Sequence, residues 1–463
     1  MKYILIIAIT ALSGCAGFSA DGGLGPAQQA AQQRLNNSEL AWARTDAERD
    51  RIDARVAELL RAPLTADAAV QIALLNHRGL QASFHELGIS EAELVQASRL
   101  PNPGFTFGKF KAGGEREIER SFHFSLARVI AMPWLRDAAR SRFEATQGAV
   151  ALRVLEHGST ARKAWVQAVA AQEGVRYAQQ VMRAAEASAE LARRMQQVGN
   201  FSTLQRSREQ AFYADAALGV ARAEQTERAA RERLTRVLGL WGTQTGFLLP
   251  ERLPDLPVQA KDLPDVERTA LAQRFDVQGA RLAAQTSAAQ LGLTRTARFI
   301  DGLELGVQRN SSNERPTRRG VELGFTLPLF DGGAAAAQAE HVQRQALLRA
   351  EQTAIDARSE VREAYGAYRS AFDIARHHLD EIVPLRKRIL DENVLRYNGM
   401  LIGVFELLAD ARLQIASVNA AIDAQRDFWL ADADLDMALI GKPSMTPMTG
   451  PNTSMNAGSG EAH

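Results

Sequence analysis

The feature that most constrains the fold of this chain is that its landmarks occur twice. Two short segments of alternating hydrophobicity, each ending at a proline, are followed by long stretches with a helical pattern. The prolines, Pro133 and Pro328, are 195 residues apart, and the glycines that end the long stretches, Gly199 and Gly399, are 200 apart. Repeated spacing indicates that one structural unit occurs twice. The predicted unit is helix, strand, strand, long helix, turn and helix.

The repeat divides the chain of 463 residues into six predicted parts. The two copies cover 61–240 and 265–441, each with a strand pair, over 103–127 and 301–327, and a turn, near 199 and 399. A Pro-rich linker, 241–264, joins them. The remaining parts are a lipoprotein signal peptide over 1–14, an N-terminal segment over 15–60 and a disordered tail over 442–463.

The helical stretches are too long to stand alone. The first, over 136–197, has 62 residues and would reach about 93 Å. Globular helices average about 11–12 residues, so a helix of this length needs partners along its whole length. The shorter helices predicted over 65–99 and 202–238 together approach the same length. Antiparallel rods with turns at one end and strands at the other are therefore expected, and a soluble coiled coil would show the same helical pattern.

The strand segments add a second constraint. Apolar residues occupy alternate positions of the second pair: Leu303, Leu305 and Val307, then Val321, Leu323, Phe325 and Leu327. Period-two alternation fits a transmembrane strand with lipid on one side and a polar lumen on the other, although a half-buried soluble hairpin alternates in the same way. The polar loops are expected over 111–119 and 309–319.

Beyond the N-terminus, no apolar run reaches the roughly 20 residues that a membrane helix needs. If the mature chain enters a membrane, it is expected to do so through a closed β-barrel, since open edges would leave backbone groups unpaired in lipid. The smallest membrane barrels have about eight strands. Four strands per chain therefore predict that several chains share one barrel.

The N-terminus predicts export. Met1-Lys2 is basic, 3–12 is almost wholly apolar, and Leu12-Ser13-Gly14-Cys15 follows. This arrangement is typical of a signal peptide and resembles the bacterial lipobox, which implies a lipid-modified, palmitate-bearing N-terminus at Cys15. Cys15 is the single cysteine, so neither an internal disulfide nor a cysteine metal site can form.

Composition and motifs exclude several functions. Lys plus Arg total 55 and Asp plus Glu 54, a formal net charge of +1, which offers no clustered positive charge for nucleic acid. The sequence contains no Gly-x-Ser-x-Gly, phosphate-binding glycine loop or His-Glu-x-x-His. The chain is therefore not expected to be an enzyme, and no catalytic residue, cofactor or dedicated metal site is predicted.

The duplicated order resembles the TolC-like outer membrane efflux protein family. The residues that carry this resemblance are the lipobox at Cys15, Leu100-Pro101-Asn102-Pro103, the two prolines, the turns Val198-Gly199-Asn200-Phe201-Ser202 and Tyr397-Asn398-Gly399, and Leu407-Leu408-Ala409-Asp410-Ala411-Arg412. The resemblance implies a mainly α fold with a small β part, in which long antiparallel helices form an α-barrel. It further implies a homotrimer whose three chains share one transmembrane β-barrel.

The same resemblance implies an activity and partners. The chain would be a passive exit duct in the bacterial outer membrane, extending into the periplasm. Its partners would be a periplasmic adaptor protein, an inner membrane pump of RND type and outer membrane lipid. Residues 15–60 and 241–264 would wrap the middle of the helical tube.

Site residues also follow from the resemblance. Asp410 occupies the place of a gate aspartate, for which an ordinary exposed helix aspartate is the equal alternative; Arg412 lies about one position early for a latch with it. Adaptor contacts are expected at the turns, around Val198, Gly199, Asn200, Asn398, Gly399 and Gly403, with Gly199 and Gly399 permitting positive φ. Strand-to-helix turns are expected at Pro133 and Pro328.

Two other functions remain open from the sequence. One is a lipid-anchored periplasmic coiled coil that never enters the membrane, and the other is the outer membrane component of type I protein secretion. The transported solute, drug or metal ion, is not specified by the sequence.

Overall fold

The computed structural model describes residues 17–297, 302–326 and 333–444. The chain forms two compact units. The sheet unit comprises Met1–Ala27, Ala82–Ala151 and Phe275–Ile355, and the hairpin unit comprises Gln28–Gln81, Leu152–Arg274 and Asp356–His463. No helix within the described residues is both long and apolar enough to cross a lipid bilayer.

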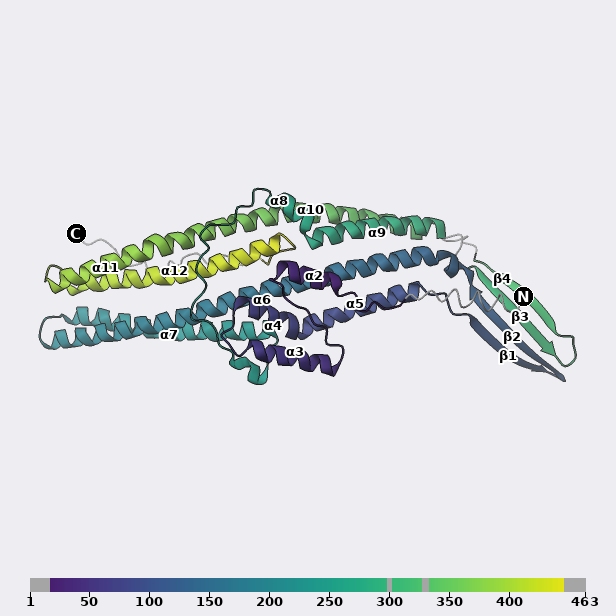
Figure 1. Ribbon diagram of the computed structural model, residues 1–463, viewed down its shortest axis with the longest axis horizontal. Coiled ribbons are helices and arrows are strands. Elements are labelled where there is room, and N and C mark those ends of the chain that lie inside the picture. The colour runs from purple at the N-terminus through teal and green to yellow at the C-terminus, as the bar shows by residue number, and fades with distance from the viewer. Residues whose placement is uncertain (1–16, 298–301, 327–332, 445–463) are drawn as a thin grey trace. The chain divides into compact units, whose positions relative to one another are not determined.

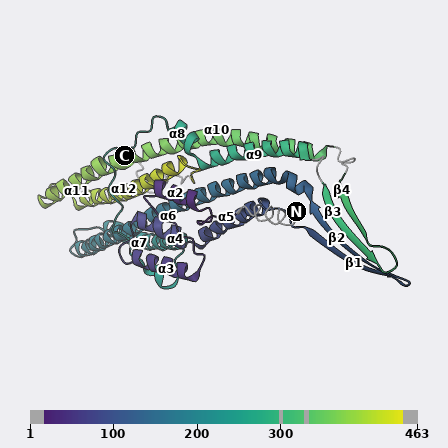
Figure 2. The same ribbon diagram turned by 45° about the vertical axis from the view of Figure 1, so that its right-hand side comes forward.

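The sheet unit contains one antiparallel sheet of four strands in the order β1-β2-β3-β4 (Figure 1). The strands are β1 (Gly104–Ala112), β2 (Glu115–Ser125), β3 (Glu304–Ser312) and β4 (Arg318–Gly324). Pairing of β2 with β3 joins the two copies of the repeat, and β1 and β4 form the edges, as Figure 2 shows. The predicted four strands are confirmed.

The first hairpin loop is shorter than expected. The loop predicted over 111–119 is only the two residues Gly113 and Gly114, and Ala112 pairs directly with Glu115. Gly113 has φ +60°, a conformation that two-residue hairpin turns require and glycine adopts without strain. Charged residues that resemble a loop in sequence therefore extend the strands.

The first long helix begins earlier than predicted. Helix α6 spans Leu126–Gln197, 72 residues, and Pro133 lies inside it. The strand-to-helix junction is at Ser125, whose hydroxyl accepts a hydrogen bond from the backbone N–H of Arg128 at 3.4 Å. This bond caps the helix start in the manner of an N-cap serine. Pro133 as the strand-to-helix turn was therefore wrong, and Pro328 lies outside the described residues.

The helices that precede each strand pair are both broken at equivalent residues. In the first copy α4 (Ala66–Asn76) and α5 (Arg78–Ala97) are separated by His77, with φ −67° and ψ 114°. In the second, α8 (Val266–Gln273) and α9 (Phe275–Ala297) are separated by Arg274, with φ −67° and ψ 125°. One extended residue interrupts each helix, so the single helix predicted over 65–99 is two helices, and so is the helix that opens the second copy.

The remaining elements follow the predicted order. They are α2 (Gly25–Arg34), α3 (Asp46–Leu59), α7 (Thr203–Leu238), the 3₁₀ turn η1 (Gly242–Gly246), α10 (Ala334–His377), the π turn η2 (His378–Ile382), α11 (Val383–Asn398) and α12 (Val404–Ala438). The second long helix is thus one rod in three parts. Helix α3 begins with a capping box between Thr45 and Glu48.

Small residues let the helices of the hairpin unit pack closely. Tyr368 and Phe372 of α10 surround Phe428 of α12, with ring centroids 5.6 and 5.7 Å apart. Buried alanines of the same two helices pack into this core: Ala364, Ala371, Ala375, Ala424, Ala431 and Ala438. Alanine combines high helix propensity with small volume, which explains its abundance here.

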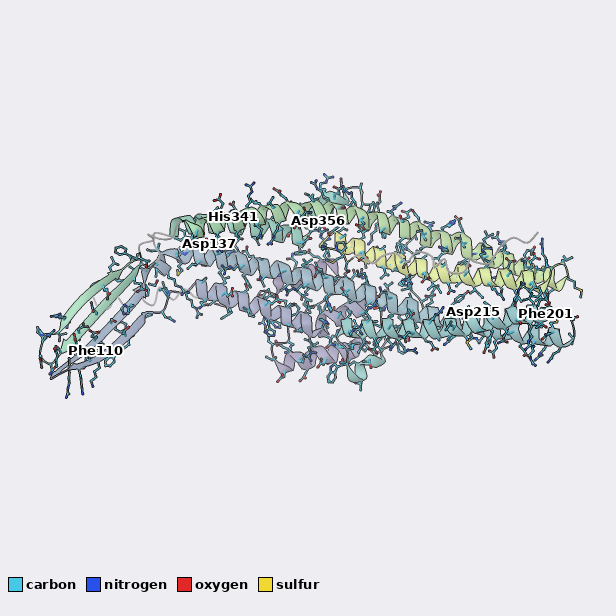
Figure 3. All side chains as sticks on the ribbon, turned by 180° about the vertical axis from the view of Figure 1, so that it is seen from behind. Phe110, Asp137, Phe201, Asp215, His341 and Asp356 are labelled. Atoms are coloured by element: carbon cyan, nitrogen blue, oxygen red, sulfur yellow. The ribbon has the colours of Figure 1, made fainter. Side chains whose placement is uncertain are left out.

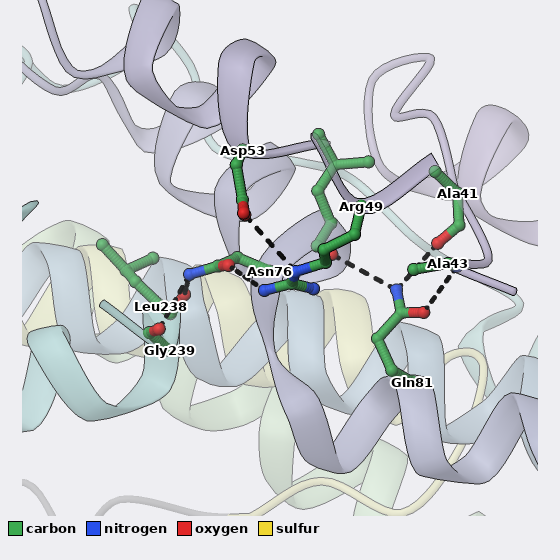
Figure 4. A network of polar contacts seen from close by, with 9 residues as sticks. Ala41, Ala43, Arg49, Asp53, Asn76, Gln81, Leu238 and Gly239 are labelled. Atoms are coloured by element: carbon green, nitrogen blue, oxygen red, sulfur yellow. Dashed lines mark hydrogen bonds and ion pairs between the residues drawn. The ribbon is translucent and has the colours of Figure 1, made fainter. Parts of the chain in front are cut away.

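Polar side chains hold both helix breaks, and Figure 4 shows the contacts around the first of them. The amide of Asn76 donates hydrogen bonds to the carbonyls of Leu238 and Gly239, at the end of α7, and its oxygen accepts one from Arg49 of α3. In the second copy, the guanidinium of buried Arg274 reaches the carbonyl of Ala438, at the end of α12, and pairs with Glu360 at 2.7 Å. Both copies therefore anchor the break to the carboxyl end of the last helix.

The first break also contains a pair of histidines, which predicts a pH dependence. The rings of His77 and His157 lie 4.2 Å apart, and burial, followed by the neighbouring His77, lowers the pKa of His157 from 6.5 to about 4. As the pH falls, His157 binds a proton at a higher pH in the unfolded chain than in the folded protein. The free energy of unfolding should therefore fall between about pH 6.5 and about pH 4, by up to about 3 kcal/mol. Thermal unfolding of the wild type and of His157→Gln over this range checks it; equal pH slopes would contradict it.

Candidate gate and turn region

The two helical turns of the hairpin unit have the same hydrogen-bond pattern but differ in residue placement. In the first, the N–H of Asn200 donates to Met195 O and that of Gly199 to Gln196 O; in the second, Leu401 donates to Arg396 O and Met400 to Tyr397 O. Both patterns are Schellman motifs. Gly199 has the left-handed φ of +83°, as predicted.

The corresponding expectation for Gly399 was wrong. Gly399 has φ −82°, and the left-handed residue is Met400, with φ +58°. The helix continues one residue further relative to its glycine than in the first copy, so the methionine takes the strained position. Met400 is 93% exposed, and its side chain therefore gains little from packing there.

A pair of substitutions tests this strain. A left-handed conformation costs a non-glycine residue about 1–2 kcal/mol, so Met400→Gly should stabilise the second turn by about 1 kcal/mol, allowing for the extra freedom of glycine in the unfolded chain. Gly199→Ala should destabilise the first turn by a similar amount. Hydrogen exchange should be about fivefold slower at the Leu401 amide in Met400→Gly and about fivefold faster at the Asn200 amide in Gly199→Ala. Unchanged exchange in both variants would contradict the assignment.

The turns expose apolar side chains. Val198, Leu204, Met400 and Leu401 are all exposed. Beneath them, Phe201 and Phe405 stack with ring centroids 5.2 Å apart, joining the first turn to the start of α12; Figure 3 labels Phe201 at this turn. Gly403 is the N-cap of α12 and offers no side-chain cap. The adaptor contact at these turns stays a prediction for Val198, Gly199, Asn200, Asn398, Gly399 and Gly403.

Asp410 has a partner within its own hairpin. It lies half-buried on α12, and its carboxylate accepts a hydrogen bond from the amide of Asn393 on α11. Asn393 is buried, so this bond fixes where the carboxylate points. Its role as a gate stays a prediction.

Arg412 engages a different carboxylate, one that sequence reasoning did not identify. Its guanidinium lies 3.0 Å from Glu209 of α7 and 4.3 Å from the ring centre of Phe212. Glu209 is only 2% exposed and also accepts a hydrogen bond from Ser188 of α6 at 2.7 Å. We call Ser188, Glu209 and Arg412 the inter-hairpin clamp, because they join α6–α7 to α12.

The sheet presents two chemically different faces. A continuous apolar row crosses all four strands through Phe105, Phe122, Val307 and Val321, which are directly paired in register. The neighbouring residues along each strand point to the opposite face. That second face carries five carboxylates, Glu115, Glu117, Glu119, Glu304 and Glu322, with His123 and Arg318. We call it the acidic face.

The alternation predicted for the strands therefore holds, and in β1 it continues through the charged residue Lys109. Lys109 shares the face of Phe105 and Phe107. Cys15 lies outside the described residues. Within the part of the chain that the structure describes, no group of three or more His, Cys, Asp or Glu side chains could hold a metal ion.

Solved structures with this arrangement identify the fold. CusC, whose crystal structures were described with transmembrane channel formation, superposes with a TM-score of 0.67 at 18% identity, over 81% of this chain and 92% of that one. The outer membrane protein VceC of Vibrio cholerae gives 0.69 at 15% identity, over 81% and 96%. The chain has the TolC-like fold. The open-state MtrE outer membrane channel of Neisseria gonorrhoeae shares this TolC-like fold, with a TM-score of 0.65 at 20% identity over 82% and 90%.

Sequence comparison also gives a relative of low identity. The cobalt-zinc-cadmium resistance protein CzcC of Cupriavidus metallidurans is 24% identical over 280 residues, which cover 58% of this chain and 64% of that protein. The match thus spans less than two thirds of the relative's length. No family model matches the chain.

Proposed function

We propose that this chain is the outer membrane channel subunit of a tripartite efflux system, a passive duct formed by three copies. The observation that carries the proposal is the sheet. Its edge strands β1 and β4 have no further strand partner among the described residues, and one face bears a continuous apolar row. In lipid, unpaired strand edges are not tolerated. Three chains would supply twelve strands, enough to close one transmembrane β-barrel.

The hairpin unit supports the rest of the proposal. Its paired helices would form the periplasmic α-barrel, and the turns at 199 and 399 would meet a periplasmic adaptor that links the duct to an inner membrane pump of RND type. Exposed Val198, Met400 and Leu401 provide an apolar surface for that contact. A lipid on Cys15 would add a second attachment to the outer membrane.

The acidic face favours cations as cargo. In a closed barrel, the face opposite the apolar row lines the lumen, which places five glutamates per chain around the exit. Rings of carboxylates attract cations and repel anions. The likeness to CzcC, named for cobalt, zinc and cadmium resistance, supports metal cations over neutral drugs as cargo.

Planar-bilayer recording of the purified protein tests the proposal. A KCl gradient should give a cation-selective reversal potential, and the Glu117→Gln/Glu119→Gln/Glu322→Gln variant should lose most of this selectivity while still conducting. The control, Glu93→Gln, alters a carboxylate on α5, outside the sheet. No conductance from the wild type would refute the duct, whereas equal selectivity in wild type and variant would refute the cation-lined lumen.

Two alternatives predict different results. A lipid-anchored periplasmic coiled coil would become a soluble monomer or dimer when Cys15→Ser removes the lipid site, whereas the proposed duct would still need detergent and remain a trimer. The outer membrane component of type I protein secretion would restore export of a protein substrate, rather than metal or drug tolerance, in cells that lack their own channel.

A further inference from the structure

The face of the sheet that carries the apolar row also carries an unexpected set of charges. The two β-hairpins, β1–β2 and β3–β4, end in turns at the far edge of the sheet. One step toward these turns from the apolar row, the next row of paired residues is Phe107, Arg120, Arg309 and Arg319. Lys109, Lys111 and Arg116 follow on the same face. We call Lys109, Lys111, Arg116, Arg120, Arg309 and Arg319 the basic belt.

The basic belt has no counter-ions of its own. The four strands place no aspartate or glutamate on this face, since all five of their glutamates lie on the acidic face. All six basic side chains are exposed, and none of them takes part in an ion pair among the described residues. Arg318, the neighbour of Arg319, is the single strand arginine on the acidic face.

The positive charge of the basic belt limits how deep in a membrane it can lie. Arg120, Arg309 and Arg319 lie two residues along their strands from the apolar row, a distance of about 7 Å. The belt begins at this row and projects from the same face of the sheet as Phe122 and Val307. An arginine or lysine on the lipid face costs about 2–4 kcal/mol at the bilayer midplane but about 0–1 near the interface. Six cations on this face therefore place the belt at the level of the lipid headgroups, where phosphate is the available anion.

We propose that the basic belt binds the phosphate groups of anionic lipids in the leaflet that surrounds the hairpin tips. The inference rests on the proposed membrane function. Guanidinium groups match phosphate oxygens in bidentate hydrogen bonds, and the three arginines of one row would act together in each chain. The belt would fix the depth of the sheet in the membrane and hold a ring of anionic lipid around the trimer.

The test compares lipids at the boundary of the reconstituted full-length trimer. In an equal mixture of phosphatidylcholine and phosphatidylglycerol, spin-labelled phosphatidylglycerol should associate preferentially with the wild type. Each basic residue near an anionic surface contributes about a fivefold preference, so Arg120→Gln/Arg309→Gln/Arg319→Gln should reduce the preference at least fivefold. Arg318→Gln, which removes an adjacent arginine from the other face, should leave it unchanged.

Further measurements distinguish a failure of the lipid-binding inference from a failure of the proposed channel function. Inorganic phosphate at the concentration of the lipid phosphate should not displace the bound lipid; displacement would show a free-phosphate site and overturn the inference. A triple variant that inserts, conducts and keeps the full lipid preference would also overturn it while leaving the duct intact. A wild type that neither inserts nor conducts would instead refute the proposed function.

Discussion

Arg412→Ala is expected to raise the conductance of the proposed duct. Glu209 is 2% exposed and Arg412 39% exposed, so removing the arginine leaves a buried carboxylate without its charge partner. Such a loss costs about 3–5 kcal/mol when both charges are buried and less when one is partly solvated. We take the cost of removing Arg412 as about 1.5–3 kcal/mol. The population of the conformation in which α7 is held against α12 should then fall about 10–100-fold. Single-channel conductance should rise severalfold.

A second substitution separates the clamp from a general loss of stability. Arg412→Leu/Glu209→Leu removes both charges and keeps apolar volume, so its conductance should lie closer to the wild type than that of Arg412→Ala. The matched control is Arg193→Ala, which breaks an exposed ion pair with Glu190 on α6. Equal conductance in Arg412→Ala, Arg193→Ala and wild type would show that the inter-hairpin clamp does not limit conductance.

Phe122→Arg/Val307→Arg is expected to prevent assembly in the outer membrane. Both residues lie in the apolar row and are directly paired across β2 and β3. An arginine on the lipid face costs about 0–1 kcal/mol near the interface and about 2–4 kcal/mol at the bilayer midplane. The apolar row lies about 7 Å from the arginine row of the basic belt, toward the bilayer centre. Taking about 1–3 kcal/mol for each arginine at this depth, six new arginines per trimer would cost about 6–18 kcal/mol. Heat-resistant trimer in outer membrane fractions should fall below detection.

The adjacent positions provide the control. Ser121→Arg/Gln308→Arg places the same two charges one residue away, on the acidic face, where Ser121 and Gln308 are also paired. This variant should assemble and show weaker cation selectivity. If both double variants assembled equally, the apolar row would not face lipid.

Local signals account for what the sequence predicted. Alternation with period two and the repeated turns depend only on neighbouring residues, and they predicted four strands, long helices and the turn at Gly199. The register was hidden because charged residues on both sides of Gly113–Gly114 resemble a loop. That register is what places Arg120, Arg309 and Arg319 in one row.

The missed features depend on distant contacts or on competing local choices. Glu209 and Arg412 are 203 residues apart, and a buried glutamate on a helix looks like a surface one in sequence. Proline is frequent in the first turn of helices, which made Pro133 look like a helix start. Ser125 instead caps α6, and the helix includes Pro133. At the second turn, the helix extends past Gly399 and leaves Met400 in the left-handed position.

The most direct test of the shared barrel is a disulfide between the two edge strands. Within one chain β1 and β4 are separated by β2 and β3, about 14 Å at about 4.8 Å per strand, too far for an internal disulfide. Thr106→Cys is combined in turn with Arg318→Cys, Gly320→Cys or Glu322→Cys, all on the acidic face, and each protein is oxidised in its membrane. At least one pair should give covalently closed trimers and nothing larger. Monomers throughout, or a ladder extending beyond three chains, would contradict a barrel built from three copies.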